Sequence, residues 1–226
     1  MRRFFLVLAL LLAPVVASAQ ARDPARFQPE FDAFAQADRE RPPPRCPIVF
    51  TGSSTIRRWT TLSLDMAPLS VLNRGFGGST VADVDFWFDQ AVARYRPRAI
   101  FFYAGDNDLA AGKTPGEVVA DFRRFMDLKD KALGRTPVWF ISVKPSKLRF
   151  DQMPQQSAVN AAVRKLADER ADLDYIDVVP AMLSDGRPKD IFVKDDLHMN
   201  PAGYAIWRRI VRPVAVKAAK APCPAG

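Results

Sequence analysis

The stretch AIFFYAGDNDLA, residues 99–110, decides the fold class. Its first half is a continuous apolar run, and its second half is a polar loop that opens with a glycine. An apolar run of this length without polar alternation is typical of a strand buried on both faces. Similar runs predict four further strands, at residues 47–50, 71–73, 138–143 and 175–179.

Helical patterns separate these runs. Thr114-Pro115-Gly116-Glu117 has the form of a capping box with proline at the first helical position, and Gly134 is a suitable stop. Strands that alternate with helices form a parallel sheet with helices on both faces, which predicts an α/β fold. The other helices are expected at 24–40, 79–95, 155–171 and from Asn200-Pro201 onward, with a short helix within 55–70.

The N-terminus has the features of a cleavable secretory signal peptide. Two arginines, Arg2 and Arg3, precede an apolar core at 4–16, and Ala17-Ser18-Ala19 fits a cleavage site. We therefore expect a secreted or periplasmic protein, exported by the general or the twin-arginine route. The expected organisation is a signal peptide at 1–19, an N-terminal helix and proline-rich linker at 20–45, one α/β domain at 46–216 and a basic tail at 217–226.

The composition is ordinary for a globular protein, with 48% hydrophobic and 26% charged residues. After the signal peptide, no segment is long and apolar enough to span a membrane. The formal charge is +8, and removal of Arg2 and Arg3 leaves +6. A positive charge can attract anionic substrates, but no zinc knuckle, basic helix or RNA-binding signature is present, so nucleic acid is not an expected partner.

The chain has two cysteines, Cys46 and Cys223. Export would permit a disulfide between them. We expect that disulfide rather than two free thiols, because it would attach the tail to the domain. Neither cysteine has a histidine near it in the sequence, so a catalytic thiol is not indicated.

Polar residues gather where the predicted strands end. In an open parallel sheet, ligands bind at the carboxyl ends of the strands. One edge would then carry a hydroxyl, flexible backbone amides, a carboxamide and an Asp–His pair, which are the groups that acyl transfer requires. The five loops are TGSST (51–55), RGFGGST (74–80), GDNDLA (105–110), KPSKLR (144–149) and DDLH (195–198).

Each of these groups also has a structural explanation. Ser54 could cap a helix, the glycines could form a tight turn, Asn107 could be a turn residue, and His198, the only histidine, could lie on the surface. Taken together, these structural explanations account less well than a catalytic site does for finding residues suited to acyl transfer at the ends of four different strands. We expect Asp195 to be the hydrogen-bond partner of His198, because residues three positions apart share a face in one turn of helix-like chain. Asp196 is only two positions from His198 and would not face the imidazole.

The motifs resemble those of the SGNH hydrolases, also called the GDSL esterase/lipase family. That family is named for Ser, Gly, Asn and His in four blocks, which here are similar to Ser54, Gly78, Asn107 and His198. The resemblance spans about residues 47–215. Within the family, one bacterial subgroup is similar to the platelet-activating-factor acetylhydrolase subunits. The chain resembles that subgroup in the segment LNRGFGGST and in the GSS form of the first block.

The resemblance implies a flavodoxin-like three-layer α/β/α fold with strand order 2-1-3-4-5. It implies Ser54 as nucleophile, His198 as base and Asp195 as the partner of that base. The family's usual aspartate before the nucleophile is replaced by Ser53 here, which raises the question of which serine attacks.

The resemblance also implies an oxyanion hole. Its donors would be the backbone N–H groups of Ser54 and Gly78 and the side chain of Asn107, with Gly77 as the alternative to Gly78. No cofactor and no metal are implied.

The expected function is that of an exported serine esterase. It would cleave small acyl groups, acetyl among them, from a sugar, a cell-wall polymer or a lipid-like alcohol. Lys144, Lys147 and Arg149 follow the fourth strand, so at least one of them should approach the site. Lys144 and Arg149 are the expected contacts with an anionic part of the substrate, and a solvated basic loop is the alternative.

Two alternatives remain. One is a non-catalytic glycan-binding domain on the same scaffold, and the other is a metal-dependent phosphoesterase that would use Asp106, Asp108, Asp195, Asp196 and His198.

Overall fold

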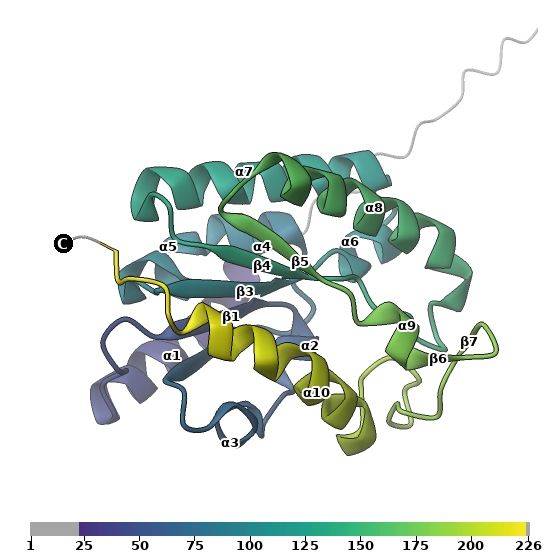
Figure 1. The fold of residues 1–226 in the computed structure, drawn as a ribbon, viewed down its shortest axis with the longest axis horizontal. Helices are drawn as coiled ribbons and strands as arrows, with labels where there is room; N and C mark the ends of the chain where they lie inside the picture. Colours follow the sequence, from purple (N-terminus) through teal and green to yellow (C-terminus); the bar gives the residue numbers. More distant parts are fainter. Residues whose placement is uncertain (1–22, 225–226) are drawn as a thin grey trace, which may run out of the picture.

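Five parallel strands form the centre of the structure, a computed structural model in which residues 23–224 are described (Figure 1). The strands lie in the order β2-β1-β3-β4-β5, with helices on both faces of the sheet. This confirms the predicted three-layer α/β/α fold. The strands are β1 (Ile48–Gly52), β2 (Val71–Gly75), β3 (Ala99–Tyr103), β4 (Val138–Ile141) and β5 (Leu173–Ile176).

Each central strand divides its side chains between two hydrophobic cores. In β3, Ile100 and Phe102 point into one core. Ala99, Phe101 and Tyr103 point into the other. Alternate residues of a strand face opposite sides, and here both sides are apolar. This is why the strand is read as an unbroken apolar run in the sequence.

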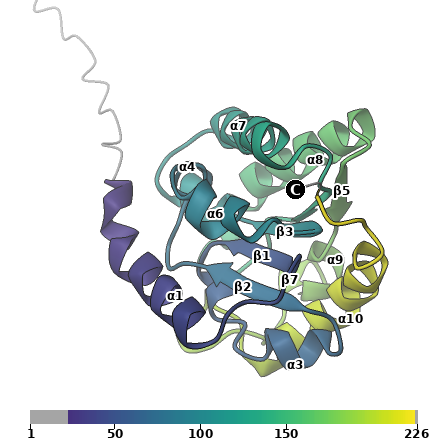
Figure 2. The same ribbon diagram turned by 90° about the vertical axis from the view of Figure 1, so that its left-hand side faces the viewer.

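Two helix layers enclose the sheet (Figure 2). Helix α1 (Gln28–Glu40) follows a short 3-10 helix, η1 (Pro24–Phe27), and lies beside β2. Phe27 of η1 and Phe31 of α1 belong to the first core. The layer on that face contains α4 (Val81–Phe86), α5 (Phe88–Ala91), α7 (Pro115–Leu133) and α8 (Met153–Glu169). The layer on the opposite face contains α2 (Ser54–Arg57), α3 (Leu62–Met66), α9 (Val179–Met182) and α10 (Pro201–Ala218). The remaining elements are η2 (Ala93–Tyr95), α6 (Asp106–Ala110), η3 (Phe150–Gln152), β6 (Leu183–Ser184) and β7 (Arg187–Pro188).

The predicted caps of two long helices are present. Thr114 and Glu117 form a reciprocal capping box at the start of α7, and Gly134 ends this helix with φ +56°. The side chain of Asn200 accepts hydrogen bonds from the first backbone amides of α10. Local sequence therefore determines where these two helices begin.

Two predicted elements differ from the structure. The helix expected at 79–95 is interrupted at Trp87, whose ring stacks on Phe31 and whose Nε1 donates to the Pro24 carbonyl. These contacts come from the N-terminal segment and override the local helical pattern. The fifth strand spans Leu173–Ile176 instead of 175–179, and it ends earlier than predicted because the chain already turns into α9 at Val179.

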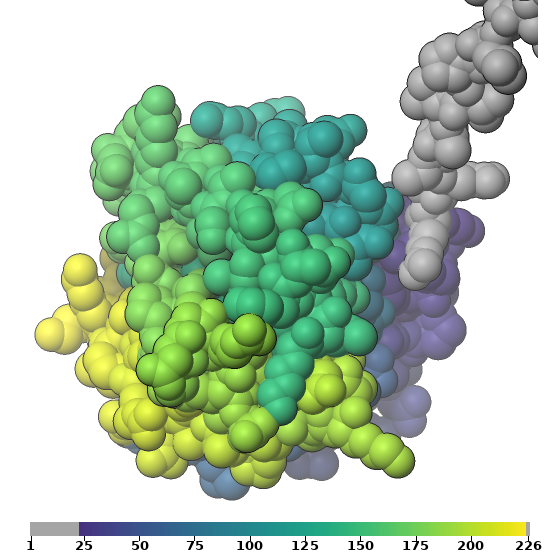
Figure 3. Space-filling view, turned by 90° about the vertical axis from the view of Figure 1, so that its right-hand side faces the viewer, coloured from purple at the N-terminus to yellow at the C-terminus, as the bar shows by residue number. Residues whose placement is uncertain are grey.

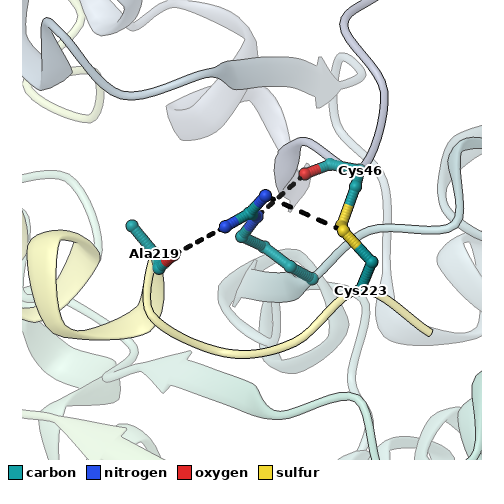
Figure 4. The surroundings of a disulfide bond; sticks show 4 residues. Cys46, Ala219 and Cys223 are labelled. Carbon is teal, nitrogen blue, oxygen red and sulfur yellow. Dashed lines mark hydrogen bonds between the residues drawn. A yellow bond between two sulfur atoms is a disulfide. The ribbon is translucent and has the colours of Figure 1, made fainter.

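A disulfide joins Cys46 to Cys223, with their Cα atoms 5.8 Å apart. The guanidinium of Arg98 lies beside it and donates to the carbonyls of Cys46 and Ala219, at 3.0 and 2.7 Å (Figure 4). The bridge attaches the C-terminal segment to the chain just before β1.

The predicted signal peptide at 1–19 lies outside the described residues. Within residues 23–224, no helix combines the length and the apolar composition that are needed to cross a membrane.

Candidate active site

The loops after the strands meet at the carboxyl edge of the sheet. The loop after β4 is joined there to the loop before α10, because the Leu148 amide donates to the Asp196 carbonyl at 3.0 Å. Figure 3 faces this edge, where the two loops lie side by side. The edge therefore gathers segments that are far apart in the sequence.

Ser54 is the first residue of α2, directly after β1. The turn before it depends on Gly52, because a Cβ there would lie 1.8 Å from the Tyr103 carbonyl oxygen. Ser54 is partly exposed. The neighbouring Ser53 is buried, and its Oγ has no hydrogen-bond partner among the described residues. Ser54 is thus the serine that presents its hydroxyl to the edge.

His198 connects Ser54 to Asp195. Its Nε2 lies 2.9 Å from Ser54 Oγ, and its Nδ1 lies 2.6 Å from Asp195 Oδ2. A carboxylate can only accept, so Nδ1 carries the proton and Nε2 is left to accept the serine hydroxyl. The Asp196 carboxylate makes no hydrogen bond to His198 within residues 23–224, and its Oδ1 lies 4.0 Å from Lys147 Nζ. The structure therefore brings together the three side chains that the sequence nominated.

Asp195 is held as a carboxylate. Its Oδ1 accepts hydrogen bonds from the backbone amides of Leu197 and His198, at 3.0 and 2.9 Å. Partial desolvation opposes ionisation, but these amide bonds and the His198 ring together lower the pKa of Asp195 well below its usual range. The negative charge is therefore present at neutral pH, where it would stabilise an imidazolium on His198.

The glycine loop after β2 distinguishes between the two candidate oxyanion donors. The Gly77 amide donates to Glu30 Oε2 at 2.9 Å and is therefore already occupied. Gly78 is exposed with φ +74°, and no hydrogen bond within residues 23–224 uses its amide. The Ser54 amide, at the first position of α2, has no acceptor within its helix. The structure therefore favours Gly78 over Gly77.

Asn107 has a fixed amide orientation. Its Oδ1 accepts from Arg149 Nη1 at 3.0 Å, and its Nδ2 donates to the Ser79 carbonyl at 3.0 Å. A guanidinium can only donate, so the oxygen of the amide must face Arg149. One hydrogen of Nδ2 remains available, and the amide lies against the same glycine loop.

Asp108 supports this arrangement, although the sequence suggested it only as a metal ligand. Both of its carboxylate oxygens accept from the Val81 amide, each at 3.1 Å. Burial raises the pKa of Asp108 to about 6. The side chain thus attaches α6 to the start of α4, a role that depends on a long-range contact and has no local sequence signal.

Lys144 and Arg149, the two residues after β4 expected to contact the substrate, differ in their exposure. Lys144 is only 1% exposed, and its Nζ donates to the Leu197 carbonyl at 2.8 Å. Because the protein encloses its ammonium group, Lys144 is not available to contact a ligand. Arg149 is partly exposed, and its Nη1 lies 3.2 Å from Asp106 in addition to its bond with Asn107. Both cations therefore support groups of the site.

The acidic residues suggested for a metal site are engaged elsewhere. Asp106 pairs with Arg149, and Asp108 binds the Val81 amide. Within the described part of the chain, no group of three or more His, Cys, Asp or Glu side chains is arranged to hold a metal ion.

Structural comparison finds proteins with the same fold. A proposed acylhydrolase from Bacteroides fragilis is 20% identical, with a TM-score of 0.74 and coverage of 88% of this chain and 100% of that chain. A proposed platelet activating factor from Streptococcus pneumonia is 18% identical, with a TM-score of 0.73 and coverage of 84% and 92%. A carbohydrate esterase family 3 protein from Talaromyces cellulolyticus is 16% identical, with a TM-score of 0.63 and coverage of 78% and 99%.

Sequence comparison identifies the family. No curated protein sequence is similar enough to this chain to count as a relative. The model of the GDSL-like lipase/acylhydrolase family, however, matches residues 43–206, which include Ser54, Gly78, Asn107 and His198. The chain therefore belongs to the GDSL-like lipase/acylhydrolase family of ester hydrolases.

Proposed function

We propose that this chain hydrolyses carboxylic esters through an acyl intermediate on Ser54. One observation carries the proposal: His198 lies within hydrogen-bonding distance of both Ser54 Oγ and the Asp195 carboxylate. This is the arrangement that makes a serine hydroxyl nucleophilic near neutral pH.

In the first step, Ser54 Oγ attacks the ester carbonyl and His198 Nε2 takes its proton. The negative charge that forms on the carbonyl oxygen is stabilised by the Ser54 and Gly78 amides and by Asn107 Nδ2. The bond to the alcohol oxygen then breaks, and the alcohol leaves with the proton from His198. The acyl group is left on Ser54.

In the second step, water replaces the alcohol. His198 Nε2 accepts a proton from the water as its oxygen attacks the acyl carbonyl. The same donors stabilise the second oxyanion. The bond to Ser54 Oγ breaks, the proton returns to that oxygen, and the carboxylic acid leaves.

The proposed substrates are small acyl esters, acetyl esters among them, of a sugar, a cell-wall polymer or a lipid-like alcohol. Likeness in fold to the carbohydrate esterase supports a sugar alcohol. Arg149, partly exposed beside Asn107, is the remaining candidate for contact with an anionic part of the substrate. Initial rates on acetylated sugars, peptidoglycan fragments and p-nitrophenyl esters of increasing chain length would define both halves of the ester.

Export through the N-terminal signal is part of the proposal. The basic and apolar start of the sequence supports it. The mass of the protein recovered from its native host should correspond to a chain that starts near Gln20. A cytoplasmic protein that retains Met1–Ala19 would contradict export and leave the chemistry unaffected.

The test of the activity is turnover of p-nitrophenyl acetate by the wild type and by Ser54→Ala. We expect the variant to fold normally and to lose nearly all turnover, and a fluorophosphonate probe to label Ser54 and not Ser53. Ser53→Ala is the matched control and should react with the probe. Equal turnover in wild type and Ser54→Ala would contradict the mechanism, and binding of glycans without any turnover would favour a non-catalytic domain.

A further inference from the structure

The N-terminal segment 24–40 contacts the loop that carries Gly78. The segment precedes residue 43, where the match to the family model begins. Gly78 is exposed, and nothing lies within 4 Å of the position that a Cβ would occupy. The loop therefore has no side chain at this position to hold it, and its placement depends on the residues on either side.

Glu30 of α1 contacts two parts of the proposed oxyanion hole. Its Oε2 accepts from the Gly77 amide at 2.9 Å, one residue before Gly78. Its Oε1 accepts from Arg57 Nη1 at 2.9 Å, and Arg57 ends the helix that begins at Ser54. One carboxylate thus links the glycine loop to the helix that supplies the other backbone donor.

A side chain at position 77 would crowd these groups. A Cβ there would lie 2.3 Å from Arg57 Nη1 and 3.3 Å from Glu30 Oε1. Gly77 thus provides room for the ion pair, whereas Gly78 provides the left-handed backbone conformation. The two adjacent glycines have different physical roles.

Further contacts from the same segment hold both sides of Gly78. Before it, the rings of Phe27 and Phe31 pack edge-on against Phe76, with centroids 4.8 and 5.0 Å away. After it, Arg26 Nη2 donates at 2.7 Å to Asp83 Oδ2, and the same oxygen accepts from the Thr80 amide and hydroxyl. The loop is therefore held from residue 76 to residue 83 by residues of η1 and α1.

We propose that Glu30 is a positioning residue for the oxyanion hole, and that α1 is part of the active-site structure of this chain. The inference rests on the proposed function, with Gly78 as a donor. Donors act mainly on the transition state, so their displacement should lower kcat more than it raises KM. A misplacement of about 1 Å can cost up to ~100-fold, and we expect Glu30→Ala to lower kcat about 10-fold with little change in KM.

The experiment compares Glu30→Ala with Glu30→Gln and Asp32→Ala on p-nitrophenyl acetate. A glutamine keeps an oxygen that can accept from the Gly77 amide, so Glu30→Gln should recover most of kcat. Asp32 is the control because its carboxylate lies on the same helix, is exposed and, among residues 23–224, bonds only Gln28. A wild-type kcat in Glu30→Ala, or an equal loss in Asp32→Ala, would overturn the inference.

A measurement on the unmodified protein keeps the test independent of whether Glu30→Ala folds. The Gly77 amide is hydrogen-bonded, whereas the Gly78 amide has no acceptor in the described part of the chain, so NMR should show slower solvent exchange at Gly77. Equal exchange at both amides would contradict the contact. Failure of the proposed function is recognised separately, by turnover that survives Ser54→Ala whatever the Glu30 variants do.

Discussion

At the scale of single residues, His198 determines how the enzyme should respond to pH. An imidazolium cannot accept the proton of Ser54, so kcat/KM should fall on the acid side through one ionisation. Because the chain has one histidine, NMR of the native protein should show a single titrating imidazole. Its titration midpoint should coincide with the acid limb of kcat/KM. An acid limb that persists in a His198→Ala variant would contradict the assignment.

The neighbouring aspartates give a matched pair of variants. Asp195→Asn should retain the fold and lower kcat by about 10⁴-fold, because the imidazole loses the acceptor that fixes its tautomer. Asp196→Asn should change kcat by less than about 2-fold, because the nearest charged partner of its carboxylate is Lys147, at 4.0 Å, and not His198. Steady-state kinetics on both variants test this, and equal losses would reverse the assignment.

Asn107 permits a prediction about the oxyanion. Asn107→Ala should lower kcat by roughly 10²–10³-fold, the usual loss for one such donor. Arg149→Ala should lower it less, because the amide of Asn107 remains but loses the group that fixes its orientation. Unchanged kcat in Asn107→Ala would remove that side chain from the mechanism.

Several site residues could be nominated from the sequence because each directly follows a strand or precedes a helix. Ser54, Asn107 and His198 are of this kind, and local pattern was sufficient. Glu30 is not of this kind, and Lys144, although it follows a strand, was expected to contact the substrate and not another loop of the protein. Glu30 reaches the Gly77 amide across 47 residues, and Lys144 reaches the Leu197 carbonyl across 53, so neither role has a local signal.

At the scale of elements, the same distinction holds. The apolar strands and the cap of α7 follow from local sequence, and both were predicted. The helix expected at 79–95 was predicted wrongly as one piece, because Trp87 is held by Phe31 and Pro24 of the N-terminal segment. Where contacts from a distant element decide the backbone, periodicity alone is insufficient.

Lys144 joins the loop after β4 to the loop that carries His198. Burial lowers the pKa of Lys144 to about 8, against an ordinary value of 10.5, with Asp106 and Asp195 opposing the shift and Arg149 adding to it. Between pH 8 and 10.5 the unfolded chain holds more protons at this residue than the folded chain. The free energy of unfolding should therefore rise with pH across that window.

The variant Lys144→Met tests both parts of this role. It removes a buried cation, so stability near pH 7 should be unchanged or higher. It also removes the bond to the Leu197 carbonyl, so kcat should fall several-fold. Urea denaturation of wild type and variant from pH 8 to 10 should show a difference that grows in favour of the wild type. A difference that is independent of pH would show that Lys144 titrates normally.

At the scale of the whole molecule, the candidate active site and the disulfide lie at opposite edges of the sheet. Ser54 follows the carboxyl end of β1, whereas Cys46 precedes its amino end (Figure 1). The bridge closes a loop with a sequence separation of 177 residues, which greatly restricts the unfolded chain. Mutation of the disulfide should therefore change stability without changing catalysis, and mutation of the candidate active site should do the reverse.

The double variant Cys46→Ser/Cys223→Ser should lose roughly 2–4 kcal/mol of stability. For a domain of this size, that corresponds to a fall in Tm of about 10 °C. At 25 °C its kcat should match that of the wild type, because no group of the proposed site touches the bridge. Thermal unfolding and p-nitrophenyl acetate turnover, measured on the same samples, test the two statements together. A large loss of kcat without a loss of Tm would show that the C-terminal attachment acts on the site and not on the stability of the fold.

Thiol titration of the protein from its native host would also test the proposed export. A disulfide persists in an oxidising compartment, whereas two free thiols would be expected in the cytosol.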